Sequence, residues 1–174
     1  MENELPKRKG MRLARYDYSA GGAYFITVCV QNRRRILSEV LPPSVGDGAP
    51  DVPHLRLTKA GETVKKHLLS SERISGVTVD QYVIMPDHIH AIILLDPRKY
   101  ENTQNGTSRA PSPTNKMLPR VIAAFKRFCH LEMGEVIFQR SYSEHIVRDA
   151  EDYETRKKYI YENPNRWYYR EIQK

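Results

Sequence analysis

Apolar positions along this chain follow a period of two in some segments and a helical period in others. Residues 24–30 are rich in aromatic and β-branched side chains, which predicts a strand. Residues 77–85 keep a period of two, and residues 88–95 continue it after the break at Pro86-Asp87, which predicts a hairpin. A last strand is expected within residues 136–147.

Three segments have the pattern of amphipathic helices. Residues 58–69 begin with a threonine suited to an N-cap, and residues 118–129 place apolar side chains at i, i+3, i+4 and i+7. A third helix is expected over residues 149–162, with aspartate as its N-cap and acidic residues in its first turn. We expect Asn163-Pro164 to stop this helix, because the residue before a proline avoids helical dihedral angles.

The order of these elements predicts the fold class. Strand, helix, strand, strand, helix and strand form the β-α-β-β-α-β arrangement, followed by one more helix. We therefore predict an α+β, ferredoxin-like or RRM-like fold: an antiparallel sheet with helices on one face, plus a C-terminal helix that carries tyrosines. Length and composition predict one domain over residues 1–174, with surface insertions near 42–54 and 97–115.

Composition limits the class of protein. Neither the N-terminal segment nor any apolar run resembles a signal peptide or a membrane span of about 20 residues, so we expect a cytoplasmic protein that does not enter a membrane. The two cysteines, Cys29 and Cys129, lie far apart in apolar segments. This favours buried, reduced thiols over a disulfide framework or a zinc site.

Positive charge is concentrated at one end of the chain. The formal net charge is +7, and residues 1–35 hold eight basic side chains against three acidic ones. Together with eleven tyrosines this suits a nucleic acid, although a solvated basic surface is the alternative. Candidate DNA contacts are the triplet after the first strand and the basic residues of the second helix: Arg33, Arg34, Arg35, Arg120, Lys126 and Arg127.

His88 and His90 are the strongest candidates for chemistry. Side chains alternate along a strand, so both imidazoles should point to one face, about 7 Å apart along the strand, while Ile89 points to the other. Two imidazoles at this spacing can share a metal or a phosphate. The alternative is a pair of histidines on the wet face of an antiparallel sheet.

Tyr159 and Asn163 form a second candidate pair, one helical turn apart on one face. Tyrosine is a weak nucleophile at neutral pH and needs a nearby cation or metal to attack phosphorus. A metal held by two imidazoles and one amide oxygen would leave positions open for phosphate oxygens. The alternative is that Tyr159 simply packs in the core. Tyr153 and Tyr161 are weaker candidates, because neither has a carboxylate or a helical amide four residues later.

These residues together resemble a known family. The chain is similar to single-tyrosine HUH transposases of the REP-associated kind, relatives of the IS200/IS605 group. The stretches that match are Tyr24-Phe25-Ile26-Thr27 with the basic cluster after it, Met85-Pro86-Asp87-His88-Ile89-His90, and Tyr159-Ile160 followed by Asn163-Pro164. Insertion-sequence relatives usually carry glutamine at the position of Asn163, so the asparagine favours the REP-associated branch.

The resemblance implies a nuclease and strand transferase that acts on single-stranded DNA containing a hairpin. Tyr159 is then expected to form a 5′-phosphotyrosine link, and His88, His90 and Asn163 to hold Mg²⁺ or Mn²⁺. Arg12 and Arg15 are expected to read a short sequence beside the hairpin. Relatives act as monomers or as dimers that exchange the tyrosine helix, and both states remain open for this chain.

Two other functions are compatible with parts of the sequence. An RRM-like module that binds nucleic acid without cleaving it would need exposed aromatic residues on its central strands, for which Tyr24, Phe25 and Tyr82 are candidates. A metal-dependent hydrolase of small phosphate esters would normally use aspartate or glutamate ligands as well.

Overall fold

A four-stranded antiparallel sheet forms the centre of the fold. The computed structural model describes residues 21–43, 53–96, 98–99 and 117–173. The strands lie in the spatial order β4-β5-β1-β6, so the first strand is flanked by the third and fourth of this sheet. This order confirms the predicted ferredoxin-like fold class. The strands are β1 (Gly22–Cys29), β4 (Val77–Ile84), β5 (His88–Leu95) and β6 (Ser143–Val147).

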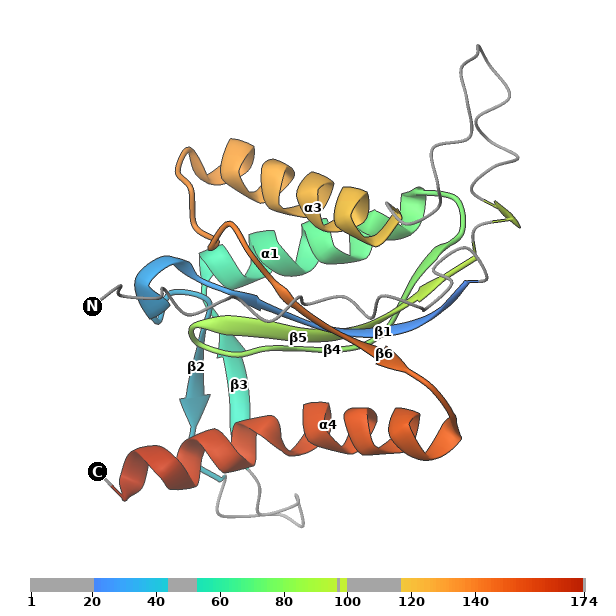
Figure 1. The fold of residues 1–174 in the computed structure, drawn as a ribbon. Helices are drawn as coiled ribbons and strands as arrows, with labels where there is room; N and C mark the ends of the chain where they lie inside the picture. Colours follow the sequence, from blue (N-terminus) through green and yellow to red (C-terminus); the bar gives the residue numbers. More distant parts are fainter. Residues whose placement is uncertain (1–20, 44–52, 97, 100–116, 174) are drawn as a thin grey trace, which may run out of the picture.

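Helices cover both faces of the sheet. The helices α1 (Lys59–Ser70) and α3 (Met117–Met133) lie side by side on one face, and α4 (Ala150–Ile172) crosses the other (Figure 1). Each face therefore has its own apolar core. The larger core lies under α1 and α3, and the smaller one lies under α4.

Side-chain alternation along β5 divides its residues between these two cores. Ile89, Ala91, Ile93 and Leu95 belong to the larger core. His88 and His90 point the opposite way, toward α4, where their rings meet aromatic side chains of that helix. The predicted separation of the histidines from the intervening apolar residues is thus confirmed.

A bulge in β4 changes the period that the sequence indicates. Val79 pairs with Ile93 and Gln81 pairs with Ile92, so two steps along β4 match one step along β5. Val79 consequently packs in the larger core, whereas Val83 packs under α4. A strict period of two would have put both on one face, so that interpretation of residues 77–85 was wrong at this point.

A two-stranded ribbon was missed by the sequence analysis. β2 (Ser38–Leu41) pairs with β3 (His54–Leu57), on either side of the predicted insertion at 42–54. Residues 44–52 lie outside the described residues, as do 97 and 100–116 of the other insertion. His54, expected in the insertion, begins a strand.

Helix α4 does not stop at Asn163-Pro164, contrary to the expectation from sequence. It continues to Ile172, although Pro164 cannot donate a hydrogen bond to the carbonyl of Ile160. Contacts made beyond the proline offset this loss. Trp167 is buried against the sheet, and Arg35 pairs with Glu171 at 2.9 Å.

The two cysteines differ in burial, and Cys29 is only half-buried. Cys129 is fully buried, and burial raises its pKa to about 12; burial also raises the pKa of Cys29. Both are free thiols, as predicted. Among the residues that the structure describes, no helix combines the length and the apolar character needed to cross a bilayer.

The first turn of α1 gives a test of the packing. Thr58 caps the helix by accepting a hydrogen bond from the Gly61 backbone, and a Cβ at Gly61 would lie 1.9 Å from the carbonyl oxygen of Leu37. We expect Gly61→Ala to lower the free energy of unfolding by about 1–3 kcal/mol, since the clash outweighs a gain in helix propensity of about 1 kcal/mol. Urea denaturation measures this. The exposed control Lys59→Ala should stay within about 0.5 kcal/mol of wild type, and an unchanged Gly61→Ala would contradict the close approach.

Candidate active site

Two buried imidazoles face each other on the α4 side of β5. The ring centroids of His88 and His90 are 4.6 Å apart, and the two residues are 8% and 5% exposed. The histidines therefore do not lie on a wet sheet face, which was the alternative explanation for their spacing.

One nitrogen of each imidazole is already hydrogen-bonded to a neighbouring oxygen atom. His88 Nδ1 lies 2.5 Å from Asp87 Oδ1, and His90 Nδ1 lies 2.8 Å from Thr27 Oγ1. Histidines that bind metals generally hold their ring in this way, with the second nitrogen hydrogen-bonded to a neighbouring oxygen. The arrangement leaves Nε2 of each ring as the nitrogen that can bind a metal.

Backbone contacts hold the turn that carries Asp87. The Val30 amide donates to the Asp87 carbonyl at 2.8 Å, and the Leu37 amide donates to the Pro86 carbonyl at 3.0 Å. Arg33, whose backbone has a left-handed φ of 54°, reaches the Asp87 carboxylate at 3.6 Å. The segment after β1 thus fixes the carboxylate that orients His88.

Burial also sets the charge of the two imidazoles. It lowers the pKa of His88, and it lowers the pKa of His90 to about 3, with the neighbouring His88 adding to the effect. Both rings are therefore neutral near pH 7, which is the form that binds a metal.

Tyr159 projects from α4 onto the histidine pair. Its ring centroid lies 5.1 Å from that of His90 and 5.9 Å from that of Phe25. The Arg166 guanidinium lies 5.4 Å from the centre of the same ring. A single chain thus brings together the tyrosine and histidines that the sequence analysis singled out.

Asn163 occupies the helical position between two residues that touch the histidines. Tyr159, Asn163 and Trp167 are spaced by four residues along one face of α4. The first contacts His90, and the Trp167 ring lies 6.0 Å from that of His88. Asn163 is buried, at 6% exposure, and lies between these two residues on the same face of α4.

The other tyrosines of α4 have different surroundings. Tyr153 donates a hydrogen bond to Asp80 at 2.5 Å, and this contact raises its pKa to about 12. Tyr161 is 76% exposed and lies on another side of the helix. His145 of β6 is hydrogen-bonded to Asp152 at 2.7 Å.

The arginine triplet after β1 only partly borders the site. Arg33 contacts Asp87, and the Arg35 guanidinium lies 5.3 Å from the centre of the Trp167 ring. Arg34 points elsewhere and pairs with Glu135 at 3.0 Å. Two of the three arginines therefore lie beside residues that contact or orient His88.

The basic residues of α3 lie far from the histidines. Arg120 and Arg127 are exposed on α3, on the opposite side of the sheet from α4 (Figure 1). Lys126 is buried, and its ammonium group donates to the carbonyls of three consecutive residues, Gln139, Arg140 and Ser141. This placement does not support a DNA contact by Lys126, and it gives the side chain a role in holding the loop before β6. Arg12 and Arg15 lie outside the described residues.

Some residues of the site escaped the sequence analysis. Asp87 directly precedes His88 in the sequence, and its position was a usable signal. Thr27 could be found only from the pairing of β1 with β5, which places it opposite His90. Within the described ranges, no three histidine, cysteine, aspartate or glutamate side chains gather as a metal site. Asn163 is the candidate third ligand that the sequence analysis named.

Comparisons with known proteins give the chain named relatives. No protein-family model matches it. An uncharacterized protein of Haemophilus influenzae is 27% identical, over 92% of this chain and 89% of its own length. A second protein of that species, named "Putative REP-associated tyrosine transposase", is 26% identical over 92% of this chain and 80% of its own length. The REP-associated tyrosine transposase of Escherichia coli is 24% identical over 84% of this chain and 68% of its own length.

This chain is therefore similar to REP-associated tyrosine transposases. Its fold agrees with the relationship. A solved structure of a REP-associated tyrosine transposase bound to a REP hairpin superimposes with a TM-score of 0.57 at 22% identity. The match covers 89% of this chain and 73% of the transposase.

The environment of Tyr153 gives a pH-dependent test. Because the pKa of this phenol is raised from 10 to about 12 in the folded protein, its contribution to stability is complete below pH 10 and is lost between pH 10 and 12. We expect Asp80→Asn to bring the Tyr153 pKa back toward 10, since the carboxylate that disfavours the phenolate is gone. NMR titration of ¹³Cζ-labelled tyrosine, with Tyr153→Phe for assignment, measures this. An unshifted Tyr153 resonance in Asp80→Asn would contradict the cause.

Proposed function

We propose that this protein is an endonuclease and strand transferase for single-stranded DNA that contains a hairpin, with Tyr159 as its nucleophile. The observation that carries the proposal is the contact between the Tyr159 and His90 rings, 5.1 Å apart in one chain. The relationship to REP-associated tyrosine transposases supports the substrate class.

The donor set suits a divalent metal such as Mg²⁺ or Mn²⁺. His88 and His90 would hold it through Nε2, with the Asn163 amide oxygen as a third ligand, because their Nδ1 atoms are held by Asp87 and Thr27. Both imidazoles are neutral near pH 7, so no proton has to leave before the metal binds. When bound, the metal would polarise the phosphate and offset the charge that develops on its oxygens.

Tyr159 then performs the covalent step. Its Oη forms a bond to phosphorus and loses its proton, while the bond from phosphorus to the 3′ oxygen breaks. The products are a 5′-phosphotyrosine and a 3′-hydroxyl, which takes up a proton. Attack of a 3′-hydroxyl on the phosphotyrosine reverses the exchange, rejoins a strand and restores the phenol. Phe25 packs edge-on against the Tyr159 ring and limits its movement.

Arginines beside the site can position the DNA backbone. Arg33 and Arg35 lie next to Asp87 and Trp167, and Arg166 lies next to Tyr159. The pairs of Arg35 with Glu171 and of Arg166 with Glu162 are partly solvent-accessible, and such pairs are weak enough to be exchanged for a phosphate. Arg33 and Arg35 thus remain candidate DNA contacts, and Arg166 joins them.

The two rival functions fit the described residues less well. An RRM-like module needs an open sheet face, but Tyr24 and Phe25 are buried, and helices lie over both faces of this sheet. A hydrolase of small phosphate esters would need a richer set of carboxylate ligands than two imidazoles and an amide.

Formation of a covalent adduct tests the nucleophile. The protein is incubated with labelled single-stranded hairpin DNA and Mn²⁺, denatured, and analysed on a gel. We expect Tyr159→Phe to abolish the adduct, a loss of at least about a thousandfold, while leaving DNA affinity unchanged. The matched controls Tyr153→Phe and Tyr161→Phe should form it. If Tyr159→Phe still formed the adduct and one of the two controls did not, the tyrosine replaced in that control would be the nucleophile.

The hydrogen bond between Thr27 and His90 gives a test of the metal site. We expect Thr27→Val to weaken Mn²⁺ binding about 10- to 100-fold, because His90 loses the oxygen that orients its ring. Titration followed by electron paramagnetic resonance measures the affinity. The control is Thr78→Val on β4, whose side chain is exposed. Equal affinities of Thr27→Val and wild type would show that His90 does not bind the metal in this orientation.

A further inference from the structure

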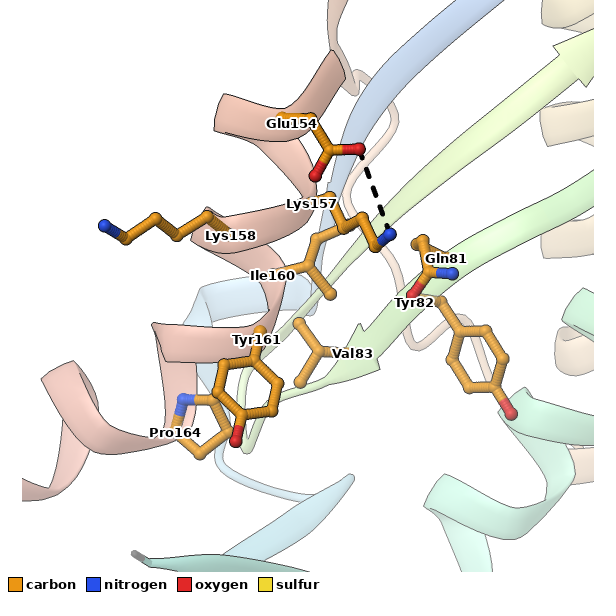
Figure 2. Close-up of a pocket in the computed structure, with 9 residues that line it drawn as sticks. All are labelled: Gln81, Tyr82, Val83, Glu154, Lys157, Lys158, Ile160, Tyr161 and Pro164. Carbon is orange, nitrogen blue, oxygen red and sulfur yellow. Dashed lines mark ion pairs between the residues drawn. The ribbon is translucent and has the colours of Figure 1, made fainter. Parts of the chain in front are cut away.

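A groove between α4 and the edge strand β4 lies next to the candidate active site. Its volume is about 510 Å³. The residues that line it come from the middle of β4 and from successive turns of α4 (Figure 2): Gln81, Tyr82, Val83, Glu154, Lys157, Lys158, Ile160, Tyr161 and Pro164.

The residues of the groove floor are neighbours of candidate active-site residues. Val83 pairs with His90 across the two strands, and Ile160 follows Tyr159 in α4. Both apolar side chains are buried in the small core under α4. Neighbouring strands lie about 4.8 Å apart, so the groove begins one strand away from His90.

The chemistry of the groove suits one nucleotide. Val83 and Ile160 form an apolar floor, and the exposed Tyr161 ring stands beside Pro164 at one end (Figure 2). Lys157 extends over the groove toward Gln81. Its ammonium lies 3.9 Å from the Glu154 carboxylate, an exposed pair that costs little to exchange for a phosphate.

We propose that this groove binds a base of the single-stranded DNA that flanks the scissile phosphate, with Tyr161 stacking on the base and Lys157 contacting its phosphate. The inference rests on the proposed function, because it names where the strand leaves the site. An aromatic face with a nearby cation is the usual platform for single strands, and it accepts any base.

Strand addition is the competing use of this edge. A peptide or a second copy of the chain could pair with β4, which is the outer strand of the described sheet. The bulge between Val79 and Gln81 interrupts the regular hydrogen-bonding pattern just where such a partner would run into the groove. The lysine and the exposed tyrosine favour the nucleotide.

Two matched pairs of variants test the proposal. Tyr161→Ala is compared with Tyr169→Ala, another exposed tyrosine of α4. Lys157→Gln is compared with Lys59→Gln, an exposed lysine at the start of α1, on the other face of the sheet. The probes are a DNA hairpin alone and the same hairpin with a twelve-nucleotide single strand on either its 5′ or its 3′ side. Fluorescence anisotropy in chelator measures binding without cleavage.

We expect Tyr161→Ala to weaken binding of one flanked probe about 5- to 100-fold and to leave the bare hairpin unchanged. Lys157→Gln should reduce the slope of log affinity for that probe against log salt concentration by about 0.7, and Lys59→Gln should not. Iododeoxyuridine in the same flank should cross-link to Tyr161.

Three results would overturn the groove assignment: no change in Tyr161→Ala, an equal loss for bare and flanked probes, or sedimentation showing that Tyr161→Ala disrupts a dimer. The proposed function is judged separately, by the Tyr159 adduct. An adduct without flank binding at Tyr161 would leave the nuclease intact and remove the groove. Flank binding at Tyr161 without any adduct would support the groove and contradict the nuclease.

Discussion

The packing of α4 against the histidine-bearing face of the sheet is the interaction on which the candidate site depends. Strand alternation sends His88 and His90 to this face, but only the helix makes the face a closed, partly dry environment. The same helix brings Tyr159 onto His90 and Trp167 onto His88. The proposed nucleophile, the proposed ligands and their desolvation therefore come from one contact between elements about seventy residues apart.

Desolvation in this contact explains why the imidazoles are suited to a metal. Two cationic rings 4.6 Å apart would repel one another, and burial removes the water that would screen them. The rings stay neutral instead. Asp87 and Thr27 then fix the orientation of the two rings from the sheet and its turn, so the orientation of the imidazoles does not depend on the position of α4.

Local pattern was enough to predict the parts of the site that lie on regular elements. The alternation of β5 separates His88 and His90 from Ile89, and four-residue spacing places Tyr159 beside Asn163.

The local pattern failed to predict positions where tertiary packing overrides it. The bulge at Val79–Gln81 moves Val83 to the α4 side, and buried Trp167 carries the helix past Pro164. Lys126 looked like a surface charge, yet its ammonium is held by backbone carbonyls. Thr27 depends on strand register, which no local pattern encodes.

The central claim is that one chain supplies both the tyrosine and the histidines of a working site. Complementation between inactive variants tests it most directly: Tyr159→Phe and His90→Ala are unfolded together, refolded as a mixture, and assayed for the covalent DNA adduct beside wild type. The account predicts an adduct for wild type and none for the mixture, because neither chain holds a complete site. An adduct in the mixture would mean that α4 of one chain serves the histidines of another, and would contradict the account.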